Sequence, residues 1–501
     1  MIQEAAAPFR LSMHRRVPLV CRRDLNVVPM DFRGVRYYVI KDPIALKYHR
    51  LPAEQYFALQ QLDGERSLDQ IREALTRKFP TVRPTVAETQ ELIAKLHTEG
   101  LVVSNRPGQG AARAEQHRET QGRGVAAAVF NVLSIRLPGV DPDRFFQWVL
   151  PLTRWMFHPL TMIAAGILIL SSLLLVTMEA ETLQERLPAA SQFFGWKNLL
   201  CLWVVMGVTK IFHEIGHGLS CRYYGAECHQ IGVTLLAFFP TLYCDVTDSW
   251  MLPNKWQRIL IGAAGMIVES VLAGIAVFVW RYTHEGTLNA IALNVFFVSA
   301  VTTVIFNINP LMRLDGYYML SDWWEIPNLR QLATQAEHAW FAKLFMGADL
   351  VSADQLPSHG RTWLVVYALA SAAYGWSVML GMLLMLHTAL KPYSLQSIGS
   401  TLATMAGVSF LVGTTLSAYR VTKQPRTQPL NPQRVTFSIV VTLLLIVALF
   451  TVPVPWYRSA TFLVEPRDVR HIHTQAAGEL VRVHVKPGDV VTAGQVLAEM
   501  D

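Results

Sequence analysis

Seven long apolar runs constrain the fold of this chain more than any other feature of its sequence. The chain has 501 residues, of which 52% are hydrophobic and only 16% are charged, whereas a soluble domain carries about 25% charged residues. A membrane-spanning helix needs about 20 apolar residues in a row. We therefore expect a polytopic α-helical membrane protein with about seven transmembrane helices, at residues 157–178, 198–220, 258–281, 288–308, 363–388, 397–418 and 435–453.

The polar segments at the two ends set the expected domain boundaries. Residues 1–103 predict a small α+β, winged-helix-like domain: strand-like runs at 26–32 and 35–41 precede helices, and Ser67 and Thr85 open two of them in the capping-box pattern. The remaining boundaries are a linker and juxtamembrane segment at 104–150, a transmembrane domain at 151–453, and the start of an extracytoplasmic region at 454–501.

Charge in the loops predicts the orientation. Basic residues gather between the last two runs, and basic loops favour the cytoplasmic side. With the N-terminus in the cytoplasm, seven spans place the C-terminus in the periplasm or outside the cell. We expect a multi-pass protein of the cell inner (cytoplasmic) membrane.

The placement of basic residues in cytoplasmic loops also explains the net charge of +7, so no nucleic-acid partner is predicted. Five cysteines without a CxxC pattern indicate no disulfide framework.

The sequence His213-Glu-Ile-Gly-His217 lies near the end of the second apolar run. Two histidines four residues apart share one face of a helix, so both imidazoles can reach one Zn²⁺, with Glu214 beside it as a general base. A chance match is the alternative, but polar groups in an apolar helix are expensive and usually functional. The third ligand expected is Asp315, which follows the run at 288–308 on the same side of the membrane. Alternatively, Asp315 only forms a turn at a helix end.

Together these motifs resemble those of the site-2 protease family of intramembrane zinc metalloproteases, over about residues 195–320. The family pairs HExxH with N-x-x-P-x-x-x-L-D-G on a later helix, which here runs from Asn307 through Pro310 to Gly316. The resemblance implies a polar chamber that water enters from the cytoplasmic side. It implies three zinc ligands (His213, His217 and Asp315), a catalytic base (Glu214) and a residue that contacts substrate or water (Asn307).

The chain departs from the family pattern in two places. No PDZ-like insert is apparent, and Tyr317-Tyr318 follows the LDG sequence where the family has a further glycine. Substrate gating is therefore expected to differ.

Other polar residues in or near the apolar runs have two interpretations each. Glu269 and Lys210 are functional candidates, because ionisable residues inside a span usually have a role. The alternative is that they only pair with each other between helices.

The apolar part of the stretch 231–250 is too short to span a membrane and is broken by Pro240, which favours a re-entrant or interfacial hairpin. Its polar residues line a substrate cleft or belong to a simple interfacial loop: Cys244, Asp245 and Asp248.

The two ends resemble other modules. Residues 25–103 resemble a PqqD-like domain, which implies capture of a leader peptide by strand addition; a generic module for docking or dimerisation is the alternative. Residues 476–501 resemble half of a lipoyl-like motif from a hemolysin-D-type membrane-fusion adaptor. The chain stops where the helical hairpin of such adaptors begins, so we expect it to be part of a longer protein.

The order of modules is similar to that of fused peptide zinc metalloprotease/adaptor proteins. It predicts a zinc metalloendopeptidase that cuts a ribosomally made, modified or secreted precursor peptide and is coupled to its export. The implied partners are the precursor or leader peptide, an ABC-type or other export system, and membrane lipids. Two alternatives remain: a non-proteolytic export adaptor with a structural zinc site, and a signalling site-2 protease that cuts a membrane-bound regulator. Glu214 disfavours the first, because a structural site needs no base, and the two end modules disfavour the second.

Overall fold

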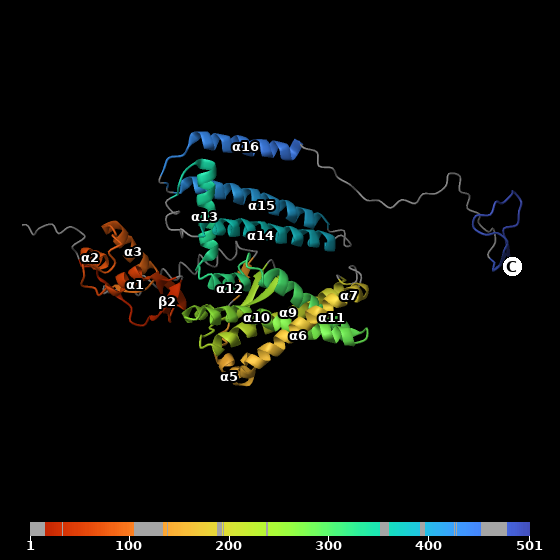
Figure 1. The fold of residues 1–501 in the computed structure, drawn as a ribbon, viewed down its shortest axis with the longest axis horizontal. Coiled ribbons are helices and arrows are strands. Elements are labelled where there is room, and N and C mark those ends of the chain that lie inside the picture. The colour runs from red at the N-terminus through yellow and green to blue at the C-terminus, as the bar shows by residue number, and fades with distance from the viewer. Residues whose placement is uncertain are drawn as a thin grey trace, which may run out of the picture. The chain divides into compact units, whose positions relative to one another are not determined.

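The computed structural model describes most of the chain, and its contacts divide it into two units, Met1–Val435 and Thr436–Asp501. Figure 1 shows the elements and their labels. The described residues are 16–32, 34–104, 134–137, 139–187, 193, 195–236, 239–350, 360–390, 396–424, 426, 428–451 and 478–501.

The first unit begins with a small α+β domain. Strands β2 (Asn26–Phe32), β3 (Val35–Asp42) and β4 (Lys47–Pro52) form an antiparallel sheet in that order, and β1 (Leu19–Cys21) pairs with β5 (Val102–Ser104). Three helices follow the sheet, namely α1 (Ala53–Gln60), α2 (Leu68–Lys78) and α3 (Val86–Thr98). The structure confirms both predicted capping boxes, at Ser67 and Thr85. It adds β1, β4 and β5, which the sequence analysis did not predict.

The sheet has two different faces. Because side chains alternate along a strand, Ile40 of β3 and Leu51 of β4 point to the core made with the three helices. Val39 faces the opposite way and packs with Phe32 of β2 against Trp250 of the short helix η3 (Thr247–Met251), which lies outside the N-terminal domain in the same unit. The second face of the sheet therefore forms the contact between the N-terminal domain and the rest of the unit.

A buried ion pair joins the two sheets of this domain. The guanidinium of Arg22 donates two hydrogen bonds to Asp42, at 2.5 and 2.9 Å. Burial alone would raise the pKa of Asp42, but Arg22 and the backbone N–H groups of Ala45 and Ile44 lower it to about 2. The stabilisation is therefore complete above the ordinary pKa of 3.8 and is lost as the pH falls toward about 2.

Replacing Arg22 by Gln is expected to destabilise this domain by about 3 kcal/mol at neutral pH, because it leaves Asp42 buried without its charge partner. Hydrogen exchange of residues 19–104 in the full chain measures the loss. Arg36→Gln is the matched control, since Arg36 pairs with Asp31 on the exposed surface and such pairs contribute little. Equal protection in both variants would contradict the role of the buried pair.

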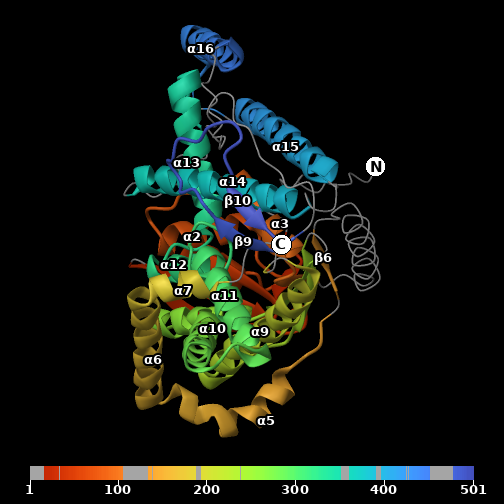
Figure 2. The same cartoon turned by 90° about the vertical axis from the view of Figure 1, so that its right-hand side faces the viewer.

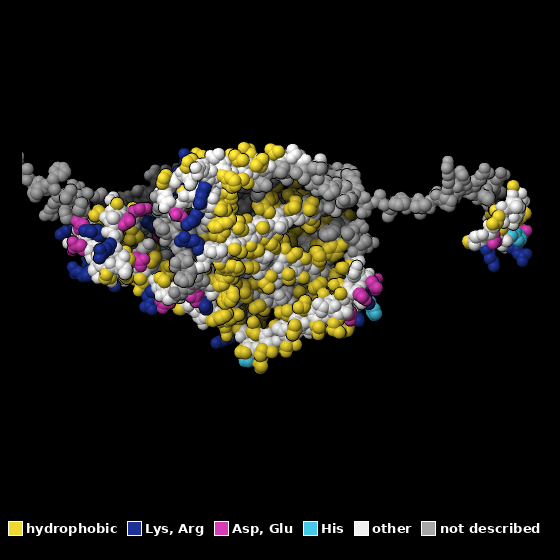
Figure 3. Space-filling view, turned by 45° about the horizontal axis from the view of Figure 1, so that its top comes forward, with side chains coloured by type: hydrophobic (Ala, Val, Ile, Leu, Met, Phe, Trp, Pro, Cys, Tyr) yellow, Lys and Arg dark blue, Asp and Glu magenta, His cyan; other side chains and the backbone are white. Residues whose placement is uncertain are grey.

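Five helices are long and apolar enough to cross a membrane: α6 (Pro159–Met178), α9 (Trp196–Tyr223), α10 (Lys255–Tyr282), the continuous segment Thr287–Asn307, which comprises α11 (Thr287–Val301) and the π-helical η4 (Thr302–Asn307), and Arg361–Thr388 of α14 (Arg361–Leu390). They correspond to five of the seven predicted spans. The other two predicted spans fall in α15 (Gln396–Lys423) and α16 (Pro432–Thr451), and their crossing of a membrane stays a prediction. Hydrophobic side chains cover the face over the helical part, while charges gather at its margins (Figure 3).

Helix α10 packs among several of the apolar helices. It packs against α6, α9, α11 and α12 (Asp315–Trp323), as Figures 1 and 2 show from two sides. The remaining short helical elements of the first unit are η2 (Arg154–Phe157), α7 (Ala180–Arg186), η3 (Thr247–Met251) and η5 (Ala342–Met346).

The predicted hairpin at 231–250 is a β-hairpin. Strands β7 (Ile231–Leu236) and β8 (Phe239–Cys244) pair antiparallel, and β6 (Ser134–Arg136) adds to β7, so that β8 is an edge strand. Residues 105–133 of the predicted linker lie outside the described residues. The end of that segment belongs to the membrane part, because α5 (Asp143–Thr153) places the fully buried Phe146 against Leu219 of α9.

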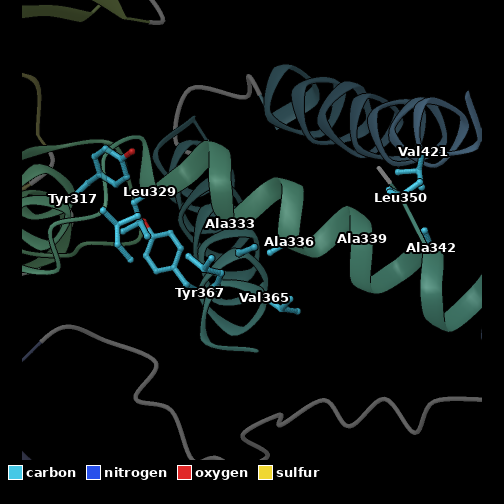
Figure 4. Packing of buried hydrophobic residues seen from close by; sticks show 13 residues of the cluster. Tyr317, Leu329, Ala333, Ala336, Ala339, Ala342, Leu350, Val365, Tyr367 and Val421 are labelled. Atoms are coloured by element: carbon cyan, nitrogen blue, oxygen red, sulfur yellow. The ribbon is translucent and has the colours of Figure 1, made fainter. Parts of the chain in front are cut away.

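A second hydrophobic core is formed by helices that follow Asp315 in the chain. Helix α13 (Leu329–Phe341) turns one face of small residues, Ala333, Ala336 and Ala339, toward a core shared with α14, and Tyr317 of α12 joins the same cluster (Figure 4). Small side chains at this spacing let helices approach closely. This packing holds the start of α12, and with it Asp315, in a fixed place.

The second unit contains one described strand pair, β9 (Leu480–Val483) with β10 (Ala498–Met500). Both strands are exposed. Residues 452–477 lie outside the described part of the chain, so the predicted lipoyl-like half-motif and its adaptor role stay predictions.

Candidate metal centre

Helix α9 brings together the three polar residues of the HEIGH sequence. His213, Glu214 and His217 are 4, 8 and 5% exposed, so the helix buries all three. The Nε2 atoms of the two imidazoles lie 3.0 Å apart, as expected for positions one helical turn apart. The expectation that both rings face one point is thus met by the geometry.

A backbone carbonyl orients the second imidazole. Nδ1 of His217 lies 2.7 Å from the carbonyl oxygen of Ile261 on α10. A carbonyl oxygen can only accept, so Nδ1 donates, and the neutral ring keeps a lone pair on Nε2. Nε2 is the atom that faces His213, which is the arrangement seen when a histidine is held ready for a metal.

Asp315 reaches the same point from α12. Its Oδ2 lies 3.0 Å from Nε2 of His213 and 3.4 Å from Nε2 of His217. Gly316 makes this approach possible, since a Cβ at that position would lie 2.5 Å from the carbonyl oxygen of Ile308. The Leu-Asp-Gly sequence therefore places the start of α12 directly against the end of the preceding helical segment.

These three residues fit a zinc ion. Their ligand atoms, from His213, His217 and Asp315, all lie within 4.8 Å of one another. Ligands held about 2 Å from a tetrahedral Zn²⁺ lie about 3.3 Å apart, close to the spacing observed. Gly265 of α10 keeps the space open, since a Cβ there would lie 2.5 Å from Nε2 of His217. A converging set of two imidazole nitrogens and a carboxylate is also the donor set of catalytic zinc sites.

A second layer of polar residues lies behind His213. Glu269 of α10 is fully buried and is 2.6 Å from Nζ of Lys210. Thr303 donates to its other oxygen at 2.6 Å, and Nδ2 of Asn307 is 3.5 Å away. Nδ1 of His213 lies 3.4 Å from Glu269, close enough to interact with its charge. Lys210 and Glu269 therefore pair between helices, and the same pair also lies next to a residue of the candidate metal centre.

Asn307 lies in this second layer and not among the residues that line the cavity described below. Its expected contact with substrate or water stays a prediction.

A cavity of about 780 Å³ opens onto the centre. Glu214, His217 and Asp315 of the centre line it, and so do Cys244 at the end of the hairpin and the following Asp245. Among the described residues the carboxylate of Glu214 has no hydrogen-bond or ion-pair partner, so it is free to act on a molecule in the cavity. The volume of the cavity lies in the range of small-molecule pockets.

The N-terminal domain also contributes to the lining of this cavity. Lys41 of β3 lies 2.8 Å from Asp248 and 2.8 Å from Glu227, and Tyr48 of β4 donates to Asp248 at 2.8 Å. Burial and the nearby Asp248 raise the pKa of Tyr48 far above its usual value, so it stays a donor. Asp248 is therefore an anchor for the domain, whereas its neighbour Asp245 lines the cavity.

Sequence reasoning missed two parts of this arrangement. Gly265 and the Ile261 carbonyl carry no signal of their own, because their roles depend on how α10 packs against α9. The N-terminal part of the cavity lining depends on β4, which was not predicted. The signal that could have revealed β4 is that Tyr48 and Arg50, two positions apart, share one face of a strand while the apolar Leu51 lies on the other.

Comparison with known proteins gives a partial relationship. The chain is 24% identical over 132 residues to a protein named "Putative peptide zinc metalloprotease protein YydH" of Bacillus subtilis (strain 168), and the match covers 26% of this chain and 50% of that protein. The matched region thus spans about half the length of this curated relative. No family profile and no solved structure matches the chain. Over a quarter of its length, the chain is therefore similar to a zinc metalloprotease-like protein.

Proposed function

We propose that this chain is an intramembrane zinc metalloendopeptidase of the site-2 protease type. The observation that carries the proposal is the convergence of His213, His217 and Asp315 beside an unpaired Glu214 that faces a cavity. The name of the Bacillus subtilis relative supports the same reaction class. The five apolar helices support its place in a membrane, which we propose to be the inner membrane, with the N-terminus in the cytoplasm.

The residues have separate roles in hydrolysis. The two imidazoles and the carboxylate of Asp315 hold the metal. Zn²⁺ bound there would act as a Lewis acid toward a water molecule and the scissile carbonyl. Glu214 accepts the proton of the attacking water and returns it to the leaving nitrogen. Residues at the end of the hairpin and on α12 line the cavity with Glu214, so they would contact a substrate bound beside it.

The substrate we propose is a precursor peptide that is ribosomally made, modified or secreted. The N-terminal domain would capture its leader, as in PqqD-like domains, and its part in the cavity lining supports delivery to the centre. The C-terminal region would link cleavage to an export system. A structural zinc site is less well supported, because such sites have four protein ligands and the described residues gather three here.

Hydrolysis of a defined precursor tests the proposal. The purified, zinc-loaded full chain in detergent is mixed with a precursor peptide encoded beside its gene, and mass spectrometry maps any cut. Cleavage at one bond is the expected result. A zinc-loaded chain that leaves such peptides intact, while deletion of residues 476–501 stops export in cells, would replace the protease with an export adaptor.

Glu269→Gln is expected to lower zinc affinity by about tenfold to a hundredfold, the usual effect of removing a partner of a metal-binding histidine. Competition with a zinc-chelating dye measures it. The single variant leaves Lys210 without its charge partner, so the double variant Lys210→Met, Glu269→Gln separates the two effects. It restores charge balance, and we expect its zinc affinity to remain low. Wild-type affinity in both variants would show that Glu269 only pairs with Lys210.

A further inference from the structure

An arginine of the N-terminal domain lies in the cavity of the metal centre. Arg50 is on the face of β4 that points away from the domain core. Its guanidinium stacks over Phe32 at 4.6 Å and over Trp250 at 5.5 Å. Arg50 lines the same cavity as Glu214 and His217. Two aromatic rings thus hold a cation in the lining of the cavity that reaches the metal centre.

This cation forms no ion pair in the described part of the chain, although the negative charge of Asp322, which Arg258 binds, is near enough to act on it. No carboxylate lies within ion-pair distance, and its Nε is buried without a hydrogen-bond partner. Burial lowers the pKa of Arg50 to about 10, so the side chain is still charged at neutral pH. A partly buried charge without a partner is unfavourable, and aromatic stacking offsets only part of this cost.

Arg313 also lines the cavity but is exposed to solvent, whereas the other charged groups near Arg50 have partners. Arg258, which also contacts the ring of Phe32, donates to Asp322 at 2.7 Å. Asp245, a further acidic residue of the cavity lining, accepts from the backbone N–H of Thr247 at 3.0 Å. The acidic groups of the cavity outside the metal centre therefore have their own partners, and Arg50 is left with donors that face the cavity.

We propose that Arg50 binds a carboxylate of the peptide substrate, so that the N-terminal domain selects substrates at the metal centre itself. The inference rests on the proposed peptidase function. The planar guanidinium matches a carboxylate with two parallel hydrogen bonds, and its stacking fixes the plane of the fork. The carboxylate belongs either to an Asp or Glu side chain or to the C-terminus of the peptide.

Binding, measured without cleavage, tests this. The full chain with Glu214→Gln is loaded with zinc in detergent. The probes are fluorescein-labelled 12-residue peptides of Ala, Leu, Ser and Thr. One series moves a single Glu through the sequence and is compared with Gln at the same position; the second compares a free C-terminus with an amide. We expect fluorescence anisotropy to show about tenfold to hundredfold tighter binding for the carboxylate probes of one series.

Variants assign the preference to Arg50. Arg50→Gln is expected to abolish it, Arg50→Lys to keep only part of it, and the matched control Arg36→Gln to keep it in full, because Arg36 pairs with Asp31 outside the cavity. A purely structural role in stacking on Trp250 would weaken all probes equally. No carboxylate preference in any probe, or a preference that survives Arg50→Gln, overturns the proposal.

Two further outcomes are distinguishable. If Arg50→Gln does not fold, as judged by hydrogen exchange of residues 19–104, an undiminished preference in Arg50→Lys places the carboxylate elsewhere. If precursor peptides are never cut by the wild type, the peptidase function fails. The carboxylate preference is then still decided by the binding measurement, which needs no hydrolysis.

Discussion

Glu214→Gln is expected to lower the rate of peptide hydrolysis by about a hundredfold to ten-thousandfold, the range for loss of a general base, while zinc content stays that of the wild type. The amide keeps the shape of the side chain but cannot take a proton. Glu214 is not part of the three-residue cluster that could hold a metal, which is why zinc is expected to remain. Turnover of a precursor peptide and metal analysis of the same sample measure both effects.

The matched control for this variant is Glu185→Gln, the same chemical change on the exposed end of α7. It is expected to cut at the wild-type rate. Loss of zinc from Glu214→Gln would make Glu214 a ligand instead of a base. An unchanged rate with zinc retained would assign the proton transfer to another group in the cavity.

The sequence predicted the inner part of the site because it is local. His213, Glu214 and His217 lie within five residues of one helix, and helical geometry alone fixes their relation. Asp315 is far along the chain, and its choice came from a paired motif and from matching depth in the membrane. The structure supplies the physical link: Gly316 lets the start of α12 touch the backbone of the preceding helical segment.

The outer part of the site could not be predicted in the same way. Lys41 contacts Asp248, and Arg50 contacts Trp250, across at least 200 positions of sequence. Such contacts depend on which face of a sheet turns toward the membrane part, and β4 ends in a proline and carries few apolar residues. Its strand signal is weak because one face packs on helices while the other carries the polar residues of an interface.

Asp315→Asn is expected to lower zinc affinity by at least about a hundredfold, beyond the usual effect of changing a residue that only contacts a ligand. The amide keeps the size of the side chain at the start of α12 but removes the negative charge that faces both Nε2 atoms, at 3.0 and 3.4 Å. An amide oxygen is a weaker ligand for Zn²⁺ than a carboxylate. Competition with a zinc-chelating dye measures the affinity, and circular dichroism checks that the helices are intact.

Asp245→Asn is the control for this change, because Asp245 lines the same cavity but lies outside the cluster. Its zinc affinity is expected to equal that of the wild type. Comparison with Glu214→Gln then distinguishes a metal ligand from a proton acceptor. Asp315→Asn is expected to lose both zinc and cleavage, whereas Glu214→Gln is expected to lose cleavage alone. If Asp315→Asn binds zinc as tightly as the wild type, Asp315 is not the third ligand. The third ligand would then have to be a group outside the three-residue cluster found among the described residues.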